Sequence, residues 1–570
     1  MNSEPAICIE RIHKTFADKI TALDNFNAEL PVATVSGLIG PDGAGKTTLM
    51  RLIAGLLEPD QGHIRVFGQD ATTESPRVQA HLGYMPQRFG LYEDLTVQEN
   101  LDLYAELQGL PLRSRADRYR ALLHMTGLAP FTARLAGRLS GGMKQKLGLA
   151  CVLVGSPRLL LLDEPTVGVD PVSRRELWQI VYHQVKTTGL TVLLSTAYLD
   201  EAERCQEVIL IHQGGLLGQG PPDRFSQQMT GRVFQVRVEG IHKRTLQRRL
   251  ASLPDVLDTV IQGDWVRIVT ETPAPPSLGE IRQAEVIPAS PRLEDYFVAT
   301  LAKASGKAGD IELTLPRQPN KSDGKAVIVV KDLKRRFGDF YAVKGISFEV
   351  RRGEVFGLLG ANGAGKTTTF RMLCGLLPVS EGEARVAGVN MRQAPARARA
   401  HLGYMAQKFS LYGQLSVREN LKFFSGIYGL GNRERQSRIG WALTTFELVP
   451  YVHQRAVDLP LGYKQRLAMA CALLHQPEIL FLDEPTSGVD PLARREFWQR
   501  INALAEQGVT VLVTTHFMEE AEYCDRLVIM QAGAILATGT PEDIRHNART
   551  PDNPDPALED AFIQLIETKA

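Results

Sequence analysis

The clearest hydrophobic pattern in the chain is a set of short apolar runs that end in glycine-rich or acidic sequence. VSGLIG (35–40) and FGLLG (356–360) each lead into a glycine-rich turn, and the apolar runs at 159–162 and 479–482 each lead into Asp-Glu-Pro. A continuous apolar run of this length, bounded by turn residues, is typical of a buried parallel strand. The pattern therefore predicts α/β units with polar residues at the carboxyl ends of buried strands.

A different pattern occupies residues 229–302. Phe234, Val236 and Val238 alternate with polar residues, and leucines follow them at helical spacing. VLDTVIQ and WVRIVT predict two further strands, a second helix is expected around Ile281, and EVIPA predicts a last strand. The order β-α-β-β-α-β indicates a small α+β accessory subdomain.

Most of the remaining sequence occurs twice. GPDGAGKTTLMRLIAGLLEPDQG, near residue 40, returns as GANGAGKTTTFRMLCGLLPVSEG near residue 360. The offset is 320 residues from Lys46 and Lys366 through Asp170 and Asp490, and it falls to 319 just beyond. Solenoid repeats are only about 20–50 residues long, so a repeat of this length indicates a duplicated domain. We expect a first module at 1–228, the accessory subdomain at 229–302, a polar linker at 303–325, a second module at 326–546 and a C-terminal tail at 547–570.

Composition changes this picture only slightly. A length of 570 residues allows more than two folded units, at roughly 100–200 residues per domain. Lys and Arg number 65 and Asp and Glu 64, so the formal charge of +1 gives no overall field that favours nucleic acid or an anionic membrane. No apolar run approaches the ~18–20 residues that cross a bilayer, so nothing in the chain is expected to span a membrane alone.

The six cysteines show no CxxC spacing, which argues against a disulfide framework or a zinc site and suits a reducing compartment. Two pairs of them recur at the repeat offset, and we expect core packing to explain all six. They are Cys8, Cys151, Cys205, Cys374, Cys471 and Cys524.

Each module carries one glycine-rich loop between a predicted strand and a predicted helix. In such a P-loop the glycines let consecutive backbone N–H groups surround phosphate oxygens, the lysine neutralises charge on the β- and γ-phosphates, and the threonine hydroxyl can bind Mg²⁺. We therefore expect ATP and Mg²⁺ to bind. The predicted loop residues are Gly40, Pro41, Asp42, Gly43, Ala44, Gly45, Lys46, Thr47 and Thr48, and Gly360, Ala361, Asn362, Gly363, Ala364, Gly365, Lys366, Thr367 and Thr368.

The Asp-Glu-Pro sequences place a pair of carboxylates at the end of a buried strand in each module. Asp163 and Asp483 are expected to belong to the Mg²⁺ shell, and Glu164 and Glu484 to polarise the attacking water. An exposed acidic pair is usually inert, but here a P-loop precedes each pair and Pro-Thr follows it.

LSGGMKQ (139–145) precedes a helical stretch in the first module. Ser140, Gly141 and Gly142 form a helix N-terminus that can meet a γ-phosphate. This motif separates ABC ATPases from other P-loop enzymes. With GYMPQ and DEPTVGVDP, it makes the chain resemble a tandem ABC-type ATPase, most closely of the drug-exporter (DrrA-like) subfamily.

The resemblance implies an α/β fold of two P-loop ABC modules, each with a mixed-sheet core and a helical signature subdomain, and the small α+β subdomain between them. It also implies roles for residues outside the motifs already described. These are Gln87 and Gln407 as further Mg²⁺ ligands beside Thr47 and Thr367, His516 as the catalytic switch histidine, Asp170 and Asp490 as D-loop residues, and Phe16 and Phe337 as aromatics that stack on adenine. For the two phenylalanines, a half-buried place in the core is an equal alternative.

Each module departs from the family pattern once. Ala197, in STAYLDEAE, occupies the position that His516 occupies in TTHFMEEAE. In the second module the signature reads LPLGYKQ, so Pro460 and Leu461 replace its serine and first glycine. The two defects lie in different modules.

In the ABC family two modules face head to tail, and each ATP lies between the P-loop of one and the signature of the other. Pairing of the two halves of this chain would collect both defects in the pocket of Lys46 and leave the pocket of Lys366, Glu484 and His516 intact. Pairing of like halves between chains would leave a defect in every site. We therefore favour intramolecular pairing with one hydrolytic site and one site that mainly holds ATP, the alternative being that Glu164 suffices and both sites turn over.

The resemblance implies the energy-coupling subunit of a multi-subunit exporter, peripheral on the cytoplasmic side of the inner membrane. Its partners would be separate integral membrane permeases, with no nucleic acid, and the permeases would carry the specificity for the transported substrate. Two alternatives remain. An ABC-F type tandem ATPase acts on ribosomes but usually has a long charged helical linker, and a tandem ATPase of sugar importers fits the exporter-like motifs and the LEDYF sequence (293–297) less well.

Overall fold

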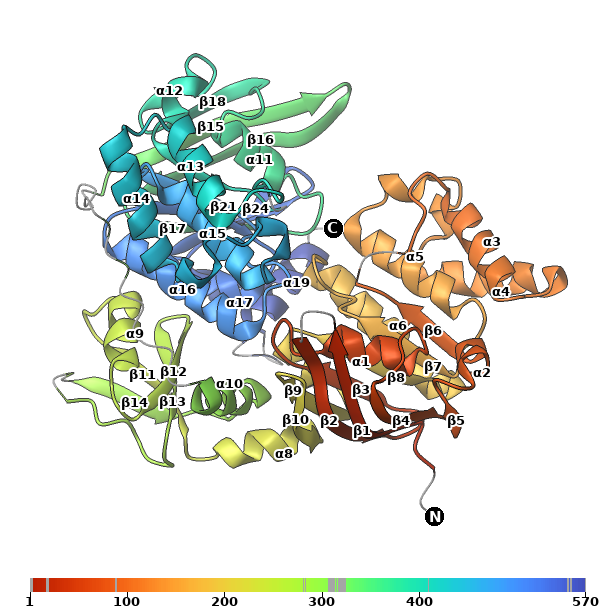
Figure 1. Cartoon of the computed structure of the whole chain (residues 1–570). Helices are drawn as coiled ribbons and strands as arrows, with labels where there is room; N and C mark the ends of the chain where they lie inside the picture. Colours follow the sequence, from red (N-terminus) through yellow and green to blue (C-terminus); the bar gives the residue numbers. More distant parts are fainter. Residues whose placement is uncertain are drawn as a thin grey trace. The chain divides into compact units, whose positions relative to one another are not determined.

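The apolar runs that predict parallel strands lie at the centre of both repeats (Figure 1). The computed structural model describes residues 4–16, 20–87, 90–279, 281, 283–305, 313, 315, 324–407, 410–550, 553 and 556–568. The chain divides into two units, Met1–Thr230 with Pro291–Val298 and Gly231–Ser290 with Ala299–Ala570.

The first unit is built around a six-stranded sheet of order β10-β9-β3-β8-β7-β6. Its strands are β3 (Val35–Ile39), β6 (Leu82–Met85), β7 (Leu159–Asp163), β8 (Thr191–Thr196), β9 (Glu207–His212) and β10 (Gly215–Gly220). All are parallel to their neighbours except β10, which runs antiparallel to β9. Every residue of β3 and β7 is buried, which explains why both strands read as continuous apolar runs.

A second, antiparallel sheet of the first unit has the order β2-β1-β4-β5. Its strands are β1 (Ile7–Phe16), β2 (Ile20–Leu30), β4 (Gln61–Val66) and β5 (Gln69–Asp70). The helices of the unit are α1 (Lys46–Ile53), α2 (Ser75–Ala80), α3 (Val97–Leu107), α4 (Leu112–Thr126), α5 (Gly141–Leu153), α6 (Pro171–Thr188), α7 (Leu199–Ala202) and α8 (Pro222–Ser226). Helix α1 contacts strands of both sheets, whereas α3, α4 and α5 pack on one another as a helical subdomain.

The second unit repeats this architecture, with sheets of order β16-β15-β18-β19 and β20-β21-β22-β17-β23-β24. The strands are β15 (Ala326–Phe337), β16 (Phe340–Arg351), β17 (Val355–Gly360), β18 (Glu381–Val386), β19 (Val389–Asn390), β20 (Leu402–Met405), β21 (Ile479–Asp483), β22 (Thr510–Thr515), β23 (Arg526–Gln531) and β24 (Ala534–Gly539). The helices are α11 (Lys366–Leu373), α12 (Pro395–Arg399), α13 (Val417–Ile427), α14 (Asn432–Thr445), α15 (Leu461–Leu473), α16 (Pro491–Glu506), α17 (Met518–Ala521), α18 (Pro541–Asn547) and α19 (Leu558–Thr568).

The accessory subdomain belongs to the second unit and contains β11 (Val233–Val238), α9 (Lys243–Ala251), β12 (Val256–Gln262), β13 (Trp265–Thr270) and β14 (Ala284–Pro288). The strands form one antiparallel sheet of order β12-β13-β11-β14. Leu246 and Leu250 of α9 pack on Phe234 and Val236 of this sheet, as their spacing predicts.

The second helix expected around Ile281 is a wrong prediction. The described residues between β13 and β14 form turns and irregular structure, and the N–H of Ile281 closes a turn on the carbonyl of Leu278. Pro273, Pro275 and Pro276 cannot lie inside a helix, and too few residues follow them to form one before β14 begins.

The boundaries predicted around the linker also change. Helix α10 (Leu293–Ser305) extends past residue 302, and Pro291–Val298 belongs to the first unit, so the accessory subdomain is shorter than expected. Leu313 and Leu315 are buried in the core of the second unit. Most of the predicted linker, 303–325, lies outside the described residues. The tail is helical over α19, whose LEDAF sequence repeats the LEDYF of α10.

Five of the six cysteines are buried, as core packing predicts, but Cys8 is only partly buried on β1. Among the residues that the structure describes, no helix combines the length and the hydropathy needed to cross a bilayer.

Candidate active sites

The P-loop of the first module is shaped by glycine at its helix end. Gly45 caps α1 with φ 108°, and a Cβ there would lie 2.4 Å from the carbonyl oxygen of Ala22. In the second module Gly365 caps α11 with φ 101°, and its Cβ would lie 2.7 Å from the carbonyl oxygen of Ala342. The positive φ and the close backbone both require glycine at this position of each loop.

The lysine of each P-loop folds back over the loop. Lys46 Nζ donates to the carbonyl oxygens of Gly40 and Pro41, at 2.7 and 3.2 Å. Lys366 Nζ donates to the corresponding carbonyl oxygens of Gly360 and Ala361, at 2.6 and 3.1 Å. Each ammonium group is therefore held at the rim of a loop whose N–H groups can donate hydrogen bonds to phosphate oxygens.

One face of each loop is open. Gly43 (φ 78°) and Gly363 (φ 83°) have no heavy atom within 4 Å of the place where a Cβ would stand. Close approach of a phosphate to the backbone needs this free space, which a methyl group would occupy. The loop residues thus fit the triphosphate predicted for them.

Thr47 and Asp163 meet at the end of the first-module strands. Thr47 Oγ1 donates to Asp163 Oδ2 at 2.9 Å, and Ser195 Oγ donates to the other carboxylate oxygen at 2.6 Å. In the second module Thr514 Oγ1 donates to Asp483 Oδ1 at 2.5 Å, and burial raises the pKa of Asp483. A hydroxyl beside a buried carboxylate is an oxygen ligand set that suits Mg²⁺, so these residues fit the ion that ATP brings.

The two glutamates that follow these aspartates have matching environments. Glu164 and Glu484 adopt φ of 51° and 45°, a conformation in which few non-glycine residues are found, and both are buried. Their N–H groups donate to Ser195 Oγ and Thr514 Oγ1, each at 3.0 Å. This hydrogen bond holds each carboxylate at the strand end despite the unfavourable backbone conformation.

The glutamines predicted to bind Mg²⁺ each contact the glutamate of their own module. Gln87 Nε2 donates to Glu164 Oε2 and Gln407 Nε2 donates to Glu484 Oε2, both at 2.6 Å. The glutamine that follows β6 or β20 is therefore within one hydrogen bond of the predicted base.

The modules differ at one equivalent position, which is Ala197 in the first module and His516 in the second. His516 is buried, its Nδ1 lies 3.3 Å from Glu484 Oε2, and its Nε2 has no hydrogen-bond partner among the described residues. A buried ring nitrogen without a partner is costly unless a ligand meets it, which fits a γ-phosphate. Ala197 offers only a methyl group at the matching place.

The glutamate pKa values shift in opposite directions. Burial raises the pKa of Glu164, and the charge of Lys46 only partly opposes the rise. Burial also raises the pKa of Glu484, but the neighbouring His516 and then the charge of Lys366 outweigh it, so that this pKa lies below its ordinary value. The second-module carboxylate is thus the more strongly held in its ionised form.

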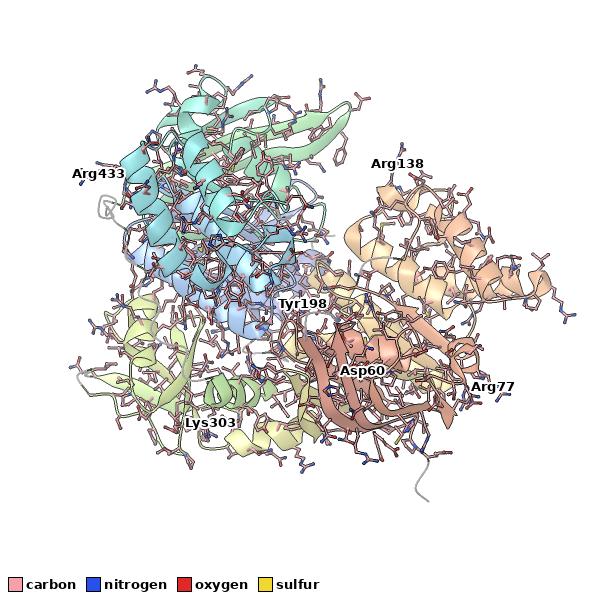
Figure 2. The ribbon with its side chains drawn as sticks, viewed as in Figure 1. Asp60, Arg77, Arg138, Tyr198, Lys303 and Arg433 are labelled. Carbon is pink, nitrogen blue, oxygen red and sulfur yellow. The ribbon has the colours of Figure 1, made fainter. Side chains whose placement is uncertain are left out.

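The helices that follow the two signature motifs differ in their N-terminal caps. Ser140 caps α5 and accepts a hydrogen bond from the N–H of Met143 at 3.3 Å, and Arg138 lies exposed just before it (Figure 2). Pro460 caps α15 without a side-chain hydrogen bond. The first-module helix N-terminus therefore presents a hydroxyl and glycine backbone, which the second module replaces with Pro460 and Leu461.

The D-loop residues cap the helices that follow them. Asp170 Oδ1 accepts from the N–H of Ser173, and Asp490 Oδ1 accepts from the N–H groups of Leu492 and Ala493, all at 3.1 Å. In each module the aspartate thereby fixes where α6 or α16 begins.

Phe16 and Phe337 are 44% and 46% exposed, so neither is a core residue. Lys14 Nζ lies 5.8 Å from the ring centre of Phe16, and the guanidinium of Arg335 lies 4.5 Å from that of Phe337. Phe16 pairs with Ile20 at the end of the β1–β2 hairpin. Ile20 is two residues before Ala22, whose carbonyl oxygen lies beside Gly45 of the P-loop. Both rings are about half exposed, and the stacking of adenine on them stays a prediction.

Sequence reasoning missed Ser195 and Thr514, which bond both the aspartate and the glutamate of their module. Their signal is a hydroxyl residue at the same repeat position near the end of an otherwise apolar strand, in TVLLST and TVLVTT.

Known proteins match the chain in a way that reflects its duplication, because one family model matches both modules. The family model "ABC transporter" matches residues 23–167 and 343–487. The chain is 53% identical over 538 residues to "Probable multidrug ABC transporter ATP-binding protein YbhF" of Escherichia coli (strain K12), a match that covers 93% of this chain and 92% of that protein.

Two relatives match a single module. The chain is 38% identical over 219 residues to "Linearmycin resistance ATP-binding protein LnrL" of Bacillus subtilis (strain 168), covering 38% of this chain and 70% of that protein. It is 41% identical over 217 residues to "Nod factor export ATP-binding protein I" of Burkholderia orbicola (strain AU 1054), covering 38% of this chain and 71% of that protein.

Proposed function

Because this chain belongs to the ABC transporter family, as a tandem ATPase coupled to transport, we propose that it powers a multi-subunit exporter mainly through one of two composite ATP sites. The named functions of its relatives, multidrug transport, linearmycin resistance and Nod factor export, support the export direction.

The observation that carries the proposal is the distribution of the two defects. Ala197 and the Pro460–Leu461 pair lie in different modules, so head-to-tail pairing of the halves collects both in one pocket. The other pocket then combines the second-module P-loop, Glu484 and His516 with the first-module signature that begins at Ser140. This head-to-tail arrangement is taken from the family resemblance.

The residues of the intact pocket have distinct tasks in hydrolysis. Lys366 and the N–H groups of the P-loop bind the β- and γ-phosphates. Mg²⁺ would be held by Thr367, Gln407 and Asp483 and would neutralise phosphate charge. Glu484 orients the attacking water and accepts its proton, while His516 donates a hydrogen bond to the γ-phosphate. The N-terminus of α5 stabilises the charge that develops on the departing phosphate.

The other pocket keeps the residues that bind nucleotide but lacks the switch histidine and the serine and first glycine of the signature. Lys46, Thr47 and Asp163 match their second-module counterparts, so ATP is expected to bind there. Glu164 has no histidine beside it, and burial raises its pKa, whereas the pKa of Glu484 is lowered. Slow turnover with long retention of nucleotide follows.

The two glutamates provide matched variants for a test. We expect Glu484→Gln to abolish nearly all steady-state ATP turnover, and Glu164→Gln to leave most of it, with about one nucleotide retained per chain in both. If Glu484→Gln turns over ATP at a rate near that of the parent, the asymmetric proposal is wrong. Equal losses in both variants would mean that both pockets hydrolyse ATP.

Exposed apolar side chains support a membrane partner. They lie on the helical subdomains and just after the two glutamines that contact the catalytic carboxylates, where a soluble surface rarely gathers them. They are Tyr92, Leu107 and Leu112 in the first module, and Tyr412, Phe423, Ile427 and Val449 in the second. We propose that these side chains contact separate permease subunits, with the chain at the cytoplasmic face of the inner membrane.

Co-purification tests this partner. The parent chain is expected to pull down integral membrane proteins, and Tyr412→Asp with Ile427→Asp to lose them while ATP turnover of the purified chain persists. Sedimentation with ribosomes instead, unaffected by the two substitutions, would contradict the exporter and favour a ribosome-associated tandem ATPase.

A further inference from the structure

Two basic residues at the start of α9, in the accessory subdomain, bind a turn of the second ATPase module. Lys243 Nζ donates to the carbonyl oxygens of Glu522 and Cys524, at 2.8 and 3.1 Å. The guanidinium of the adjacent Arg244 lies 2.5 Å from a carboxylate oxygen of Asp525. Arg244 is buried, so this ion pair is protected from solvent.

The same turn is held from two other directions. Glu522 Oε2 accepts from the N–H of Gly263, in the β12–β13 turn, at 2.7 Å. Asp525 Oδ2 accepts from the N–H of Val355 at 2.9 Å, the first residue of the strand that leads into the second P-loop. The turn 522–525 therefore joins the accessory subdomain to the P-loop strand.

This turn closes the segment that carries the switch histidine. His516 follows β22, the four-residue helix α17 comes next, and the turn begins directly afterwards. Within the segment, Glu520 is buried and accepts from Thr515 Oγ1 at 2.6 Å and from Thr486. A short helix fixed at both ends leaves His516 little freedom, and its C-terminal end is the one that Lys243 binds.

The accessory subdomain is firmly docked on this module rather than touching it at one point. Ile261 belongs to the hydrophobic core of the module, and Arg495 of α16 pairs with Asp258 of β12. Asn502 Nδ2, also on α16, donates to Gln247 Oε1 at 3.0 Å. Figure 1 shows α9 and this sheet beside α16 and α17. These contacts are spread over two elements of the subdomain, so its position relative to the turn is fixed.

The first module holds the matching turn differently. Glu203 Oε1 accepts from the N–H of Leu293, at the start of α10, and Gln206 Oε1 accepts from the N–H of Val35, both at 2.8 Å. Gln206 takes the place of Asp525, so the position that pairs with Arg244 in the second module carries no charge here. The basic contacts thus occur in the module that has the histidine, and the module with Ala197 has a neutral equivalent.

We propose that Lys243 and Arg244 are positioning residues for His516, through which the accessory subdomain sets the activity of the second-module ATP site. They touch neither nucleotide nor the reacting atoms, and they act by fixing the turn behind α17. The inference rests on the proposed hydrolytic role of that site.

Hydrogen exchange and turnover together test this role. In Lys243→Ala and Arg244→Ala we expect amides of 516–525 to exchange at least about fivefold faster, with exchange in β21 unchanged. Steady-state ATP turnover should fall about fivefold to tenfold, with KM for ATP within about twofold of the parent. Lys243→Arg should restore part of the loss. Arg249→Ala, which removes an exposed charge from the same helix, is the matched control.

A double-mutant cycle separates positioning from general destabilisation. If Lys243 acts through His516, Lys243→Ala should change single-turnover hydrolysis by less than about twofold in a His516→Ala background. Unchanged exchange at 516–525, or an equal loss of hydrolysis in both backgrounds, overturns the proposal. If Glu484→Gln turns over like the parent, the proposed function fails, and the exchange measurement still decides whether the subdomain fixes this segment.

Discussion

Nδ1 of His516 lies 3.3 Å from Oε2 of Glu484, whereas the matching position beside Glu164 is Ala197. Both glutamates are buried, bond a glutamine and follow an aspartate, so the histidine is the main difference between their surroundings. The opposite pKa shifts of the two carboxylates follow from it. The two modules thus show the same glutamate in the same fold, once beside a histidine and once beside an alanine.

The first prediction concerns pH. Glu484 accepts a proton only when ionised, so hydrolysis falls as pH drops through its pKa, which lies below the ordinary value. His516→Ala removes the largest influence that lowers this pKa, while burial, which raises it, remains. The acid limb of hydrolysis should therefore move to higher pH. Single-turnover rates from about pH 3 to 8, a range that includes the ordinary pKa of a glutamate, measure this shift. An acid limb that stays in place would contradict the assignment.

The second prediction repairs the defective pocket. In a Glu484→Gln background, Pro460→Ser with Leu461→Gly restores the hydroxyl and glycine that cap α5 in the first module. We expect measurable ATP turnover to return, and adding Ala197→His to raise it further, because the signature and the histidine act on the same phosphate. Helix α15 should gain up to ~1 kcal/mol from the new cap.

The control for this repair is the same set of substitutions with Glu164→Gln added, which should remove any restored turnover. If turnover stays at background in the fully repaired chain, the pocket is inactive for another reason. Ala197 and Pro460 would then not explain why it does not hydrolyse ATP.

The third prediction concerns acid stability. The pKa of Asp525 is lowered to about 2, since His242, Arg244 and the N–H of Val355 outweigh the effect of burial. A carboxylate with a lowered pKa stabilises the fold above its unfolded pKa of about 4, and this contribution is lost as pH falls toward about 2. Asp525→Asn should therefore lower the free energy of unfolding by roughly 2 kcal/mol at neutral pH and by much less near pH 2.

Urea unfolding at both pH values checks this, with Asp24→Asn as a control because Asp24 is exposed and its ion pair with His13 is exposed as well. A loss for Asp525→Asn that is the same at both pH values would show that the carboxylate charge is not what stabilises this turn.

The motifs were predictable because each depends on local backbone. A P-loop needs glycine at Gly43 and Gly45, and a carboxylate at a strand end needs an apolar run before it, so short sequences suffice. The expected helix near Ile281 failed for a local reason too, since the prolines at 273, 275 and 276 were present but outweighed by the regular β-α-β-β-α-β pattern.

The docking of the accessory subdomain could not be predicted in the same way. Lys243 and Arg244 lie about 280 residues before the turn they bind, and nothing in their local sequence distinguishes them from the exposed Arg248 and Arg249. A pairing of this kind depends on where two folded surfaces meet. The roles of Ser195 and Thr514 are partly predictable. Both modules have a hydroxyl residue at this position, but only the structure shows its two hydrogen-bond partners.

The last prediction separates the shape of the P-loop from its binding surface. Gly45→Ala would place a methyl group 2.4 Å from the carbonyl of Ala22 at φ 108°, so the loop must shift, and both stability and ATP binding should be lost. Gly43→Ala meets no neighbour, so it should cost only about 1 kcal/mol for its left-handed backbone yet weaken ATP binding at least tenfold, because the methyl group occupies the open phosphate face. Thermal unfolding with and without Mg²⁺–ATP, in chains that carry Lys366→Ala to silence the second loop, distinguishes the two. Parent-like ATP stabilisation of Gly43→Ala would mean that the phosphates do not bind at this face.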